Sequence, residues 1–571
     1  MPTIDISIED FSKLIESDHL LTVNELDNLI SFAIAEVDSE PDGPDENGHT
    51  KISIDIKTSN RPDLWSAEGL ARLVKGNNGT LGLPDLSSSP SDYKIIVDPE
   101  TEKIRPYIAA AIVRGLKFDD FLIKQMIQIQ DKLDYSYGRK RKRSSIGIYN
   151  INMISSPIHY KMVDRDFEFT PLNFENNMSI EDIFSNHPKG IEFGHILSKS
   201  KKVPILIDSE ERVLSLPPII NSHDVGRVTT ESKDVLIETT GTDKETVLIA
   251  LDCVTQALRD RGGAIESVEI IYKSNIEITP QNTPKEIKIN PKIINSYLGT
   301  TFTNDQIITF LERRRHNVVK IEDELLIKYA PWRKDIHHWV DISEDIAMAS
   351  DYNTLIPTIP KVVTSGKISP SSEDENMLRE IFIGMQLIEV MNYILTDPII
   401  LSDKINKPMN NSTNDIVEIK NPITSTFSVI RSQLLPILLS FESKNTHIEY
   451  PHKIFEIGEV VKNIQKNLLT KTHAAVLLTG SNETFETILS VLDGFMRLQN
   501  LDYLLEDTDD EMFISGRRAL IKIDDIPIGK IGEINPSILN NFGIEVPSAG
   551  LEIDLTKIPN LRIKEYDTNK L

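Results

Sequence analysis

The chain contains the same pattern twice, and this repeat constrains its architecture. The stretch "SNRPDLWSAEGLA", from Ser59, aligns with "PWRKDIHHWVDISEDIA", from Pro331, if the second copy carries a short insertion. In the first copy the preceding segment "KISIDI" alternates apolar and polar residues, as a half-buried strand does. A chain of 571 residues is too long for one hydrophobic core. The sequence therefore predicts a multidomain protein, in which two similar modules of helices and strands flank a separate middle region.

The second copy carries more carboxylates than the first. The alignment pairs three polar residues: Arg61 with Arg333, Asp63 with Asp335 and Glu68 with Glu344. Asp341 has no counterpart, and Asp345 stands where the first copy has Gly69. On a helix Asp341, Glu344 and Asp345 share one side, and Asp335 can fold back toward them from the preceding turn.

Three interpretations of this acidic helix remain open on spacing alone. Asp341 and Glu344 fit a capping box, which explains two of the acids, and spacing favours this interpretation. Four hard oxygen ligands without a thiolate instead suit magnesium. Zinc at His337 and His338 is the third alternative, but adjacent residues seldom bind one metal, and a third nitrogen or sulfur ligand is not evident.

The bulk composition excludes several function classes. Hydrophobic residues make up 39% of the chain and charged residues 26%, which is typical of a folded globular protein. The formal net charge of −25 argues against a protein that coats nucleic acid or anionic membrane through its overall field. Cys253 is the single cysteine, so intrachain disulfides and thiolate metal clusters are excluded. Because neither a signal peptide nor a long apolar run is present, the sequence predicts a soluble cytoplasmic protein without membrane contact.

The middle region combines a basic run with polar residues in apolar strands. Residues Arg139 to Arg143 are five consecutive cations, flanked by Tyr135, Tyr137 and Tyr149, a composition that can grip a phosphate backbone and stack exposed bases. A solvated loop is the equal alternative. Further on, the runs "VLSLPPIIN" and "DVLIETT" read as strands that carry polar side chains, which either line a pocket or face water: Ser215, Asn221, Glu238 and Thr240.

Taken together, several motifs resemble one family along nearly the whole chain. They are "SNRPDLWSAEGLAR", "GRKRKRSSIGIYN", "LPPIINSHDVGRVTTESKDVLIETTGTD", "WRKDIHHWVDISEDIAMA", "NPITSTFSVIRSQLLPILL", "KIFEIGEVV" and "IGEINPSILNNFGIEVP". In this order they resemble the beta subunit of phenylalanyl-tRNA synthetase in its archaeal and eukaryotic form. The resemblance implies an α+β multidomain fold with four parts: a winged-helix-like module (1–94), a mixed α/β editing domain (95–275), a second winged-helix-like module (276–358) and a class II synthetase-like antiparallel sheet domain without catalytic motifs (359–571).

The resemblance also assigns candidate site residues. It implies that Mg²⁺ is bound by Asp335, Asp341, Glu344 and Asp345. It places the pocket that hydrolyses mischarged tyrosyl-tRNA at Leu206, Ser215, Asn221, Glu238 and Thr240, with Glu238 accepting a hydrogen bond from the phenol and Leu206 packing the ring. It favours tRNA contacts by Arg139, Lys140, Arg141, Lys142 and Arg143, with Arg313 to Arg315 as a weaker second candidate.

The partners that the resemblance implies depend on a motif that the C-terminal part lacks. It has no class II ATP signature, so the resemblance implies that ATP is bound by an alpha subunit, within a complex of two alpha and two beta chains that acts on phenylalanine tRNA. Two alternatives come from other function classes. One is a free-standing deacylase of mischarged tRNA, and the other is a non-enzymatic nucleic-acid-binding protein, which the acidic composition disfavours.

Overall fold

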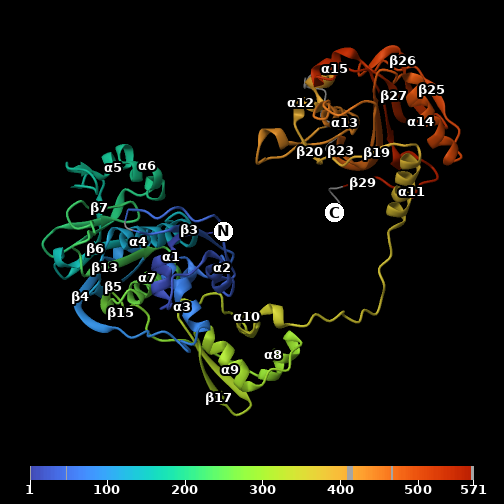
Figure 1. Ribbon diagram of the computed structural model, residues 1–571. Helices are drawn as coiled ribbons and strands as arrows, with labels where there is room; N and C mark the ends of the chain where they lie inside the picture. The colour runs from blue at the N-terminus through green and yellow to red at the C-terminus, as the bar shows by residue number, and fades with distance from the viewer. Residues whose placement is uncertain (1, 47, 408–415, 465–466, 568–571) are drawn as a thin grey trace. The chain divides into compact units, whose positions relative to one another are not determined.

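The computed structural model describes residues 2–46, 48–407, 416–464 and 467–567, which fold into two compact units, residues 1–359 and 360–571 (Figure 1). Both units combine helices with several sheets, so the fold is a multidomain α+β architecture. Within the described residues, no helix has the length and apolar character needed to cross a membrane.

The repeat predicted from the sequence corresponds to two small sheets of identical order in the first unit. The first sheet has the order β1 (Thr3–Ser7), β3 (Lys51–Ile56), β2 (Ala35–Val37), and the second has β16 (Lys285–Ile289), β18 (Glu324–Tyr329), β17 (Asn317–Ile321). All strand pairs in both sheets are antiparallel. The segment "KISIDI" forms β3 and alternates between buried and less buried residues, as its period-two pattern indicates.

The helices of the two modules also correspond. In the first module α1 (Ile8–Leu14), α2 (Val23–Ser31) and α3 (Ala67–Asn77) surround the sheet, and in the second α8 (Pro291–Leu298), α9 (Asn304–Arg313) and α10 (Trp339–Ser350) do so. A capping box starts both α2 and α9. The capping interpretation placed Asp341 at the N-cap of α10, and this was wrong. His338 is the N-cap, and Asp341 is the third helical residue, whose carboxylate accepts from the backbone of His338.

A ten-stranded mixed sheet forms the middle of the first unit. Its order is β12 (Ile220–Asn221), β11 (Val213–Leu216), β10 (Lys202–Ile207), β7 (Ile158–Asp164), β4 (Ser89–Val97), β14 (Ala264–Ile271), β5 (Tyr107–Arg114), β13 (Val235–Gly241), β6 (Ser144–Asn150), with β15 (Ile276–Thr279) on β14. The sheet therefore starts a few residues before the segment 95–275 and ends a few residues after it.

Helices α4 (Asp120–Lys132) and α7 (Lys244–Asp260) pack on one face of this sheet, and their apolar residues form one continuous core with those of the first module (Figure 1). The opposite face has its own core, which includes Leu206, Leu236 and Tyr149. Two short helices, α5 (Ile180–Asn186) and α6 (Pro188–Phe193), and the strand pair β8 (Glu168–Phe169) and β9 (Met178–Ser179) lie between β7 and β10 in the chain.

The second unit is built on an eight-stranded sheet. Its order is β19 (Ile388–Glu389), β23 (His452–Ile464), β24 (Asn467–Thr479), β28 (Ser548–Asp554), β27 (Ile526–Ile534), β26 (Phe513–Ile523), β25 (Leu504–Glu506), with β29 (Tyr566–Asp567) on β24. Every pair is antiparallel except β19 with β23.

Two separate cores cover the two faces of this sheet. Helices α11 (Pro370–Gly384) and α14 (Phe485–Leu498) contribute to one, and α13 (Leu435–Ser443) and α15 (Pro536–Phe542) to the other. A small separate sheet has the order β20 (Leu395–Thr396), β22 (Val429–Ile430), β21 (Val417–Glu418). The short helix α12 (Pro398–Leu401) follows β20 in the chain. The eight-stranded sheet is thus largely antiparallel, as predicted for the C-terminal part, and its relation to class II synthetases stays a prediction.

Candidate functional site

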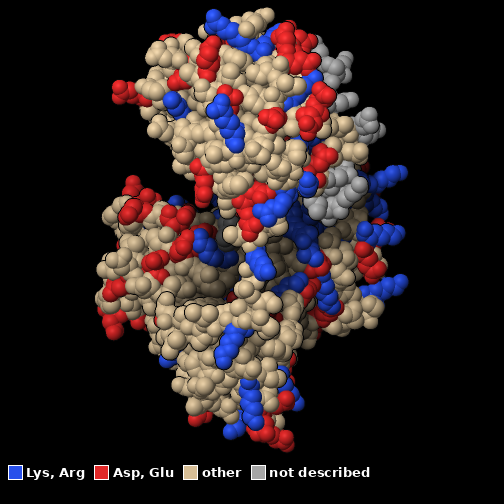
Figure 2. Space-filling model, turned by 90° about the vertical axis from the view of Figure 1, so that its right-hand side faces the viewer, with Lys and Arg blue, Asp and Glu red and all other residues tan. Residues whose placement is uncertain are grey.

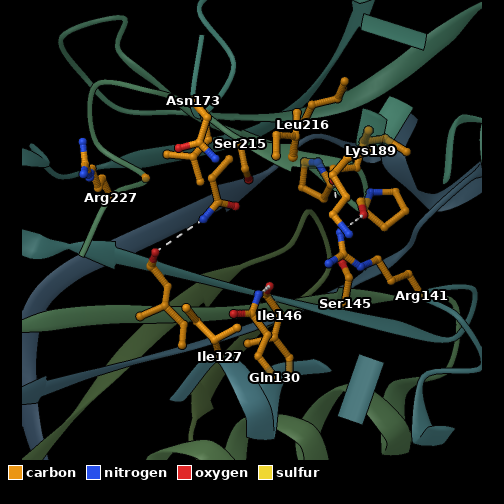
Figure 3. A pocket seen from close by; sticks show the side chains of 18 of the residues that line it. Ile127, Gln130, Arg141, Ser145, Ile146, Asn173, Lys189, Ser215, Leu216 and Arg227 are labelled. Carbon is orange, nitrogen blue, oxygen red and sulfur yellow. Dashed lines mark hydrogen bonds between the residues drawn. The ribbon is translucent and has the colours of Figure 1, made fainter. Parts of the chain in front are cut away.

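A cavity of about 600 Å³ opens where the two edges of the large sheet approach each other. Strand β12 is one edge of the sheet and β6 is the other, yet the side-chain amide of Asn221 on β12 donates to the carbonyl of Ile148 on β6 at 3.4 Å. Figure 3 shows Ser215 and Leu216 of β11 on one side of the cavity and Ile127, Gln130 and Ile146 on the other. The curvature of the sheet therefore creates a pocket that no single strand defines.

The structure brings three of the five predicted pocket residues to the cavity wall. Ser215, Asn221 and Glu238 line it. Leu206 lies behind the wall, buried on β10 opposite Ser215, and Thr240 is also fully buried. Neither of these two side chains reaches the cavity surface in the structure.

Thr240 belongs instead to a buried arginine network. Arg105, which is 1% exposed, donates from Nε to the hydroxyl of Thr240 at 2.9 Å and from Nη2 to the hydroxyl of Ser145 at 2.9 Å. Ser145 also lines the cavity. The network therefore holds one wall of the cavity in place from behind.

Glu238 is a buried acidic group in the wall of the pocket. Its side chain comes from the centre of β13, opposite Gly147 of β6, and is 2% exposed. Burial raises the pKa of Glu238 to about 7, against the opposing effects of a hydrogen bond from Tyr149 and the charge of Arg105. One carboxyl oxygen, Oε2, is buried and has no hydrogen-bond partner within the described residues. Because buried polar atoms are normally paired, this oxygen is an acceptor that a bound molecule could satisfy.

Several further side chains complete the cavity, and one of them, Arg141, was predicted from the sequence only as a tRNA contact. Arg141 donates from Nη1 to the carbonyls of Pro218 and Ile219, at 3.1 and 3.0 Å, and so lies in the wall (Figure 3). Gln130 and Lys189 also line it. Only Arg141 stood out in the sequence, as a member of the basic run. Gln130 and Lys189 belong to helices α4 and α6, where a polar residue is normally expected to face solvent.

The structure divides the basic run into paired and free cations. Arg141 forms an ion pair with Asp134 at 3.0 Å, and Arg143 lies 3.3 Å from Asp243. The other three cations, Arg139, Lys140 and Lys142, are exposed and make no ion pair within the described residues.

The tyrosines around the basic run differ in their exposure to solvent. Tyr149 is fully buried, so the expectation that it stacks on exposed bases was wrong, whereas Tyr135 is 38% exposed. Arg314, at the centre of the weaker candidate run, is 2% exposed and pairs inside the protein. On the face drawn in Figure 2, Lys and Arg are interspersed with Asp and Glu.

The carboxylate of Asp345 lies in a buried cluster of basic side chains. It is 0% exposed and accepts from Arg333 at 2.7 Å, from His316 at 2.8 Å and from Arg314 at 3.2 Å. Burial alone would raise the pKa of Asp345, but Arg333 and Arg314 outweigh it and hold that pKa well below its ordinary value. Both oxygens of Asp345 are therefore occupied by donors of this chain.

The other three predicted magnesium ligands do not converge on a common point with free oxygens. Asp335 is held by Arg333, at 2.9 and 2.7 Å. Asp341 accepts from the backbone of His337 and His338, both at 2.7 Å. Burial and the neighbouring acids raise the pKa of Glu344, the one member of the four without a pairing donor in the described part of the chain.

The arrangement of these acids does not fit a bound magnesium ion. Nowhere in the described ranges do three or more His, Cys, Asp or Glu side chains form a group that could hold a metal. Magnesium at α10 stays a prediction from the resemblance, and the geometry supports a structural role for Asp345.

The internal repeat explains why the second module needs this extra carboxylate. Helices α2 and α9 start with equivalent capping boxes, and each is followed within three residues by a residue of positive φ, Ile34 at 52° and Arg315 at 67°. This register aligns Arg314 and His316 with the buried Ala33 and Ala35 of the first module. The second module thus buries two basic side chains where the first buries alanines. An acid at the position of Gly69 supplies a counter-charge for Arg314 and a hydrogen-bond partner for His316.

Comparison with known proteins identifies the family. Residues 287–352 match the model of the tRNA synthetase B5 domain, and residues 355–555 match that of the phenylalanyl tRNA synthetase beta chain CLM domain. The phenylalanine–tRNA ligase beta subunit of Pyrococcus furiosus is 39% identical over 561 residues, covering 97% of this chain and 99% of that one. The beta subunit of Archaeoglobus fulgidus is 33% identical over 572 residues, covering 100% of both.

A solved structure agrees with these matches. The N-terminal fragment of the phenylalanyl-tRNA synthetase beta subunit from Pyrococcus horikoshii has a TM-score of 0.59 at 39% identity, and the match covers 61% of this chain and 99% of the fragment. The fold and its relatives therefore define a subunit of an aminoacyl-tRNA synthetase. The chain belongs to the family of phenylalanine–tRNA ligase beta subunits, which confirms the resemblance seen in its motifs.

Proposed function

We propose that this chain, in complex with an alpha subunit, removes tyrosine from mischarged phenylalanine tRNA in the cavity beside β6. The observation that carries the proposal is Glu238, a buried carboxyl group that lines a pocket of about 600 Å³ and whose Oε2 has no hydrogen-bond partner within the described residues. Tyrosine differs from phenylalanine by one hydroxyl. A pocket that hydrogen-bonds this hydroxyl rejects the analogue without it by roughly 10⁴- to 10⁵-fold in favourable cases, because the pocket acceptor is then left unpaired.

The walls of the cavity supply the other requirements of such a substrate. Ile127, Ile146 and Leu216 offer apolar surface for an aromatic ring. Arg141 and Lys189 place positive charge at the cavity, where the terminal phosphates of a tRNA would enter. Ser215, Asn221 and Glu238 supply polar groups that orient the ligand.

Each part of the chain has its own role in this proposal. Residues 95–275 form the editing domain, residues 1–94 and 276–358 are winged-helix-like modules, and residues 359–571 are a class II synthetase-like domain that pairs with the alpha subunit. ATP is bound and the adenylate is formed on the alpha subunit, in a complex of two alpha and two beta chains that also uses Mg²⁺. This division of labour rests on the family and on the lack of a class II ATP signature in this chain.

The test is to assay the complex and the chain alone in parallel. We expect co-purification with the alpha subunit, charging of phenylalanine by the complex, and hydrolysis of tyrosyl-tRNA faster than of phenylalanyl-tRNA. The chain alone should charge no amino acid. Full deacylation without a partner would favour the free-standing deacylase. A complex that charges phenylalanine but leaves tyrosyl-tRNA intact would overturn the editing assignment.

Neutralising the three free cations Arg139, Lys140 and Lys142 together is expected to weaken tRNA binding. Each phosphate contact contributes roughly 0.7 to 0.9 to the slope of log K against log salt, so the magnitude of this slope should fall by about two to three if the three residues contact the backbone. Binding of tRNA to the complex is measured at several salt concentrations. Glutamine at Lys288, Lys292 and Lys320, which are also exposed and without an ion pair, is the matched control. An unchanged slope in the variant that lacks the charges of Arg139, Lys140 and Lys142 would show that these residues do not contact the tRNA and form a solvated loop instead.

A further inference from the structure

The hydroxyl of Tyr149 contacts the carboxyl of Glu238, and the function proposed above gives it no role. Tyr149 is fully buried, and its hydroxyl lies 2.9 Å from Oε1 of Glu238 and 2.8 Å from the hydroxyl of Ser215. Ser215 comes from β11, whereas Tyr149 and Glu238 come from β6 and β13. The phenol therefore binds one oxygen of Glu238 at the point where the two ends of the sheet approach each other.

The backbone around Tyr149 is built to permit this contact. Across β6 and β13, Tyr149 pairs with Leu236 and Gly147 pairs with Glu238, so the tyrosine ring must lean over Gly147 to reach the carboxyl. A Cβ atom at position 147 would lie 2.2 Å from the Tyr149 hydroxyl and 2.6 Å from Oε1 of Glu238. Any side chain at this position would displace the pair, so the absence of one at Gly147 is a condition for the contact.

We propose that Tyr149 is a specificity-determining positioning residue, whose hydroxyl holds Oε1 of Glu238 so that Oε2 alone accepts the phenol of a tyrosyl group. This inference rests on the proposed function of the cavity. Because the protein's own phenol occupies one oxygen, the carboxylate presents a single acceptor in a fixed direction. A phenylalanyl group leaves that acceptor buried and unpaired, which disfavours its binding.

The charges around Glu238 determine what the loss of the Tyr149 hydroxyl would do. Burial and the charge of Asp134 raise the pKa of Glu238, while the hydrogen bond from Tyr149 and the charge of Arg105 lower it, to a balance at about 7. Tyr160 of β7 also faces this group, but its hydroxyl donates to the carbonyl of Arg105 at 2.9 Å. Loss of the Tyr149 hydroxyl removes one of the two effects that lower the pKa of Glu238, so we expect this pKa to rise and a smaller fraction of the carboxyl to be ionised at neutral pH.

The decisive experiment is the pH profile of tyrosyl-tRNA hydrolysis by the complex carrying Tyr149→Phe, after subtraction of the uncatalysed rate at each pH. Loss of one hydrogen bond to a charged group should move the midpoint upward by about one pH unit and lower kcat/KM at pH 7 roughly fivefold, with recovery at higher pH. Tyr160→Phe is the matched control, because it removes a buried hydroxyl from the same core without touching Glu238, and it should keep the wild-type midpoint.

The outcomes separate this inference from the function on which it rests. A Tyr149→Phe complex with the wild-type midpoint, or with a uniform loss at every pH, would overturn the role of Tyr149 while leaving the editing pocket intact. A wild-type complex that does not hydrolyse tyrosyl-tRNA would overturn the proposed function itself. If Tyr149→Phe does not fold, Gly147→Ala pushes the same hydroxyl away from Glu238 and should shift the midpoint in the same direction; an unshifted midpoint there also contradicts the inference.

Discussion

Replacement of Asp345 by alanine is expected to lower the free energy of unfolding of the first unit by about 3 to 5 kcal/mol, the range measured when one partner of a buried ion pair is removed. The reason is that Arg314 and Arg333, which are 2% and 4% exposed, would lose the carboxylate that they share. All three tryptophans of the chain, Trp65, Trp332 and Trp339, lie in the first unit, so their fluorescence during denaturant unfolding reports on this unit alone.

The neighbouring acids of α10 are internal controls for this measurement. Asp341→Ala removes the capping-box carboxylate that accepts from the backbone of the N-cap residue His338, and should cost about 1 kcal/mol. Glu344→Ala removes a carboxylate whose pKa is raised by burial and by the nearby acids, and should leave stability unchanged or slightly higher. The double variant Arg314→Met with Asp345→Ala should recover part of the loss, because removing both partners is less costly than stranding one.

The same variants distinguish the ion-pair role from the magnesium prediction. If Asp345 is structural, Asp345→Ala is destabilised to the same extent in excess chelator and in excess Mg²⁺ at matched ionic strength. A metal ligand behaves differently, because a bound ion stabilises only the state that binds it. A destabilisation seen only when Mg²⁺ is present would therefore assign Asp345 to a metal and contradict the structural role.

The parts of the fold that could be predicted from the sequence are those whose signal is local. The alternation in "KISIDI" depends on neighbouring residues alone, and β3 follows it. The repeat was visible because both modules use the same order of elements. The start of α10 was missed because a histidine acts as its N-cap, and the acid that follows three residues later was taken for the cap itself.

The candidate site was predicted less completely because it is assembled from distant strands. Polar residues in apolar strands were a correct signal for Ser215, Asn221 and Glu238. Nothing in the sequence shows that the two ends of a ten-stranded sheet meet, so Tyr149 was assigned to the surface and Thr240 to the pocket. Likewise Asp345 was grouped with the acids near it in the chain, as a magnesium ligand. Its partners Arg314 and His316 lie about thirty residues earlier, just after α9, and this distance in sequence hid the ion pair.

Replacement of Glu238 by glutamine is expected to lower kcat/KM for tyrosyl-tRNA hydrolysis by about 10- to 100-fold, the equivalent of one hydrogen bond to a charged group. Glutamine keeps the size of the side chain and removes the negative charge that accepts the phenol. Because burial of the native carboxyl costs free energy, as its pKa of about 7 indicates, the variant should be no less stable than the wild type. A loss of activity without a loss of stability identifies a binding group rather than a structural one.

Two further variants make this result interpretable. Glu269→Gln makes the same change on β14 of the same sheet, at a side chain that pairs with Lys94 away from the cavity, and should hydrolyse tyrosyl-tRNA at the wild-type rate. Glu238→Asp keeps the charge on a shorter side chain, and should retain more activity than Glu238→Gln. Hydrolysis by Glu238→Gln at the wild-type rate would remove Glu238 from the site, since the buried Oε2 would then have no part in choosing tyrosine over phenylalanine.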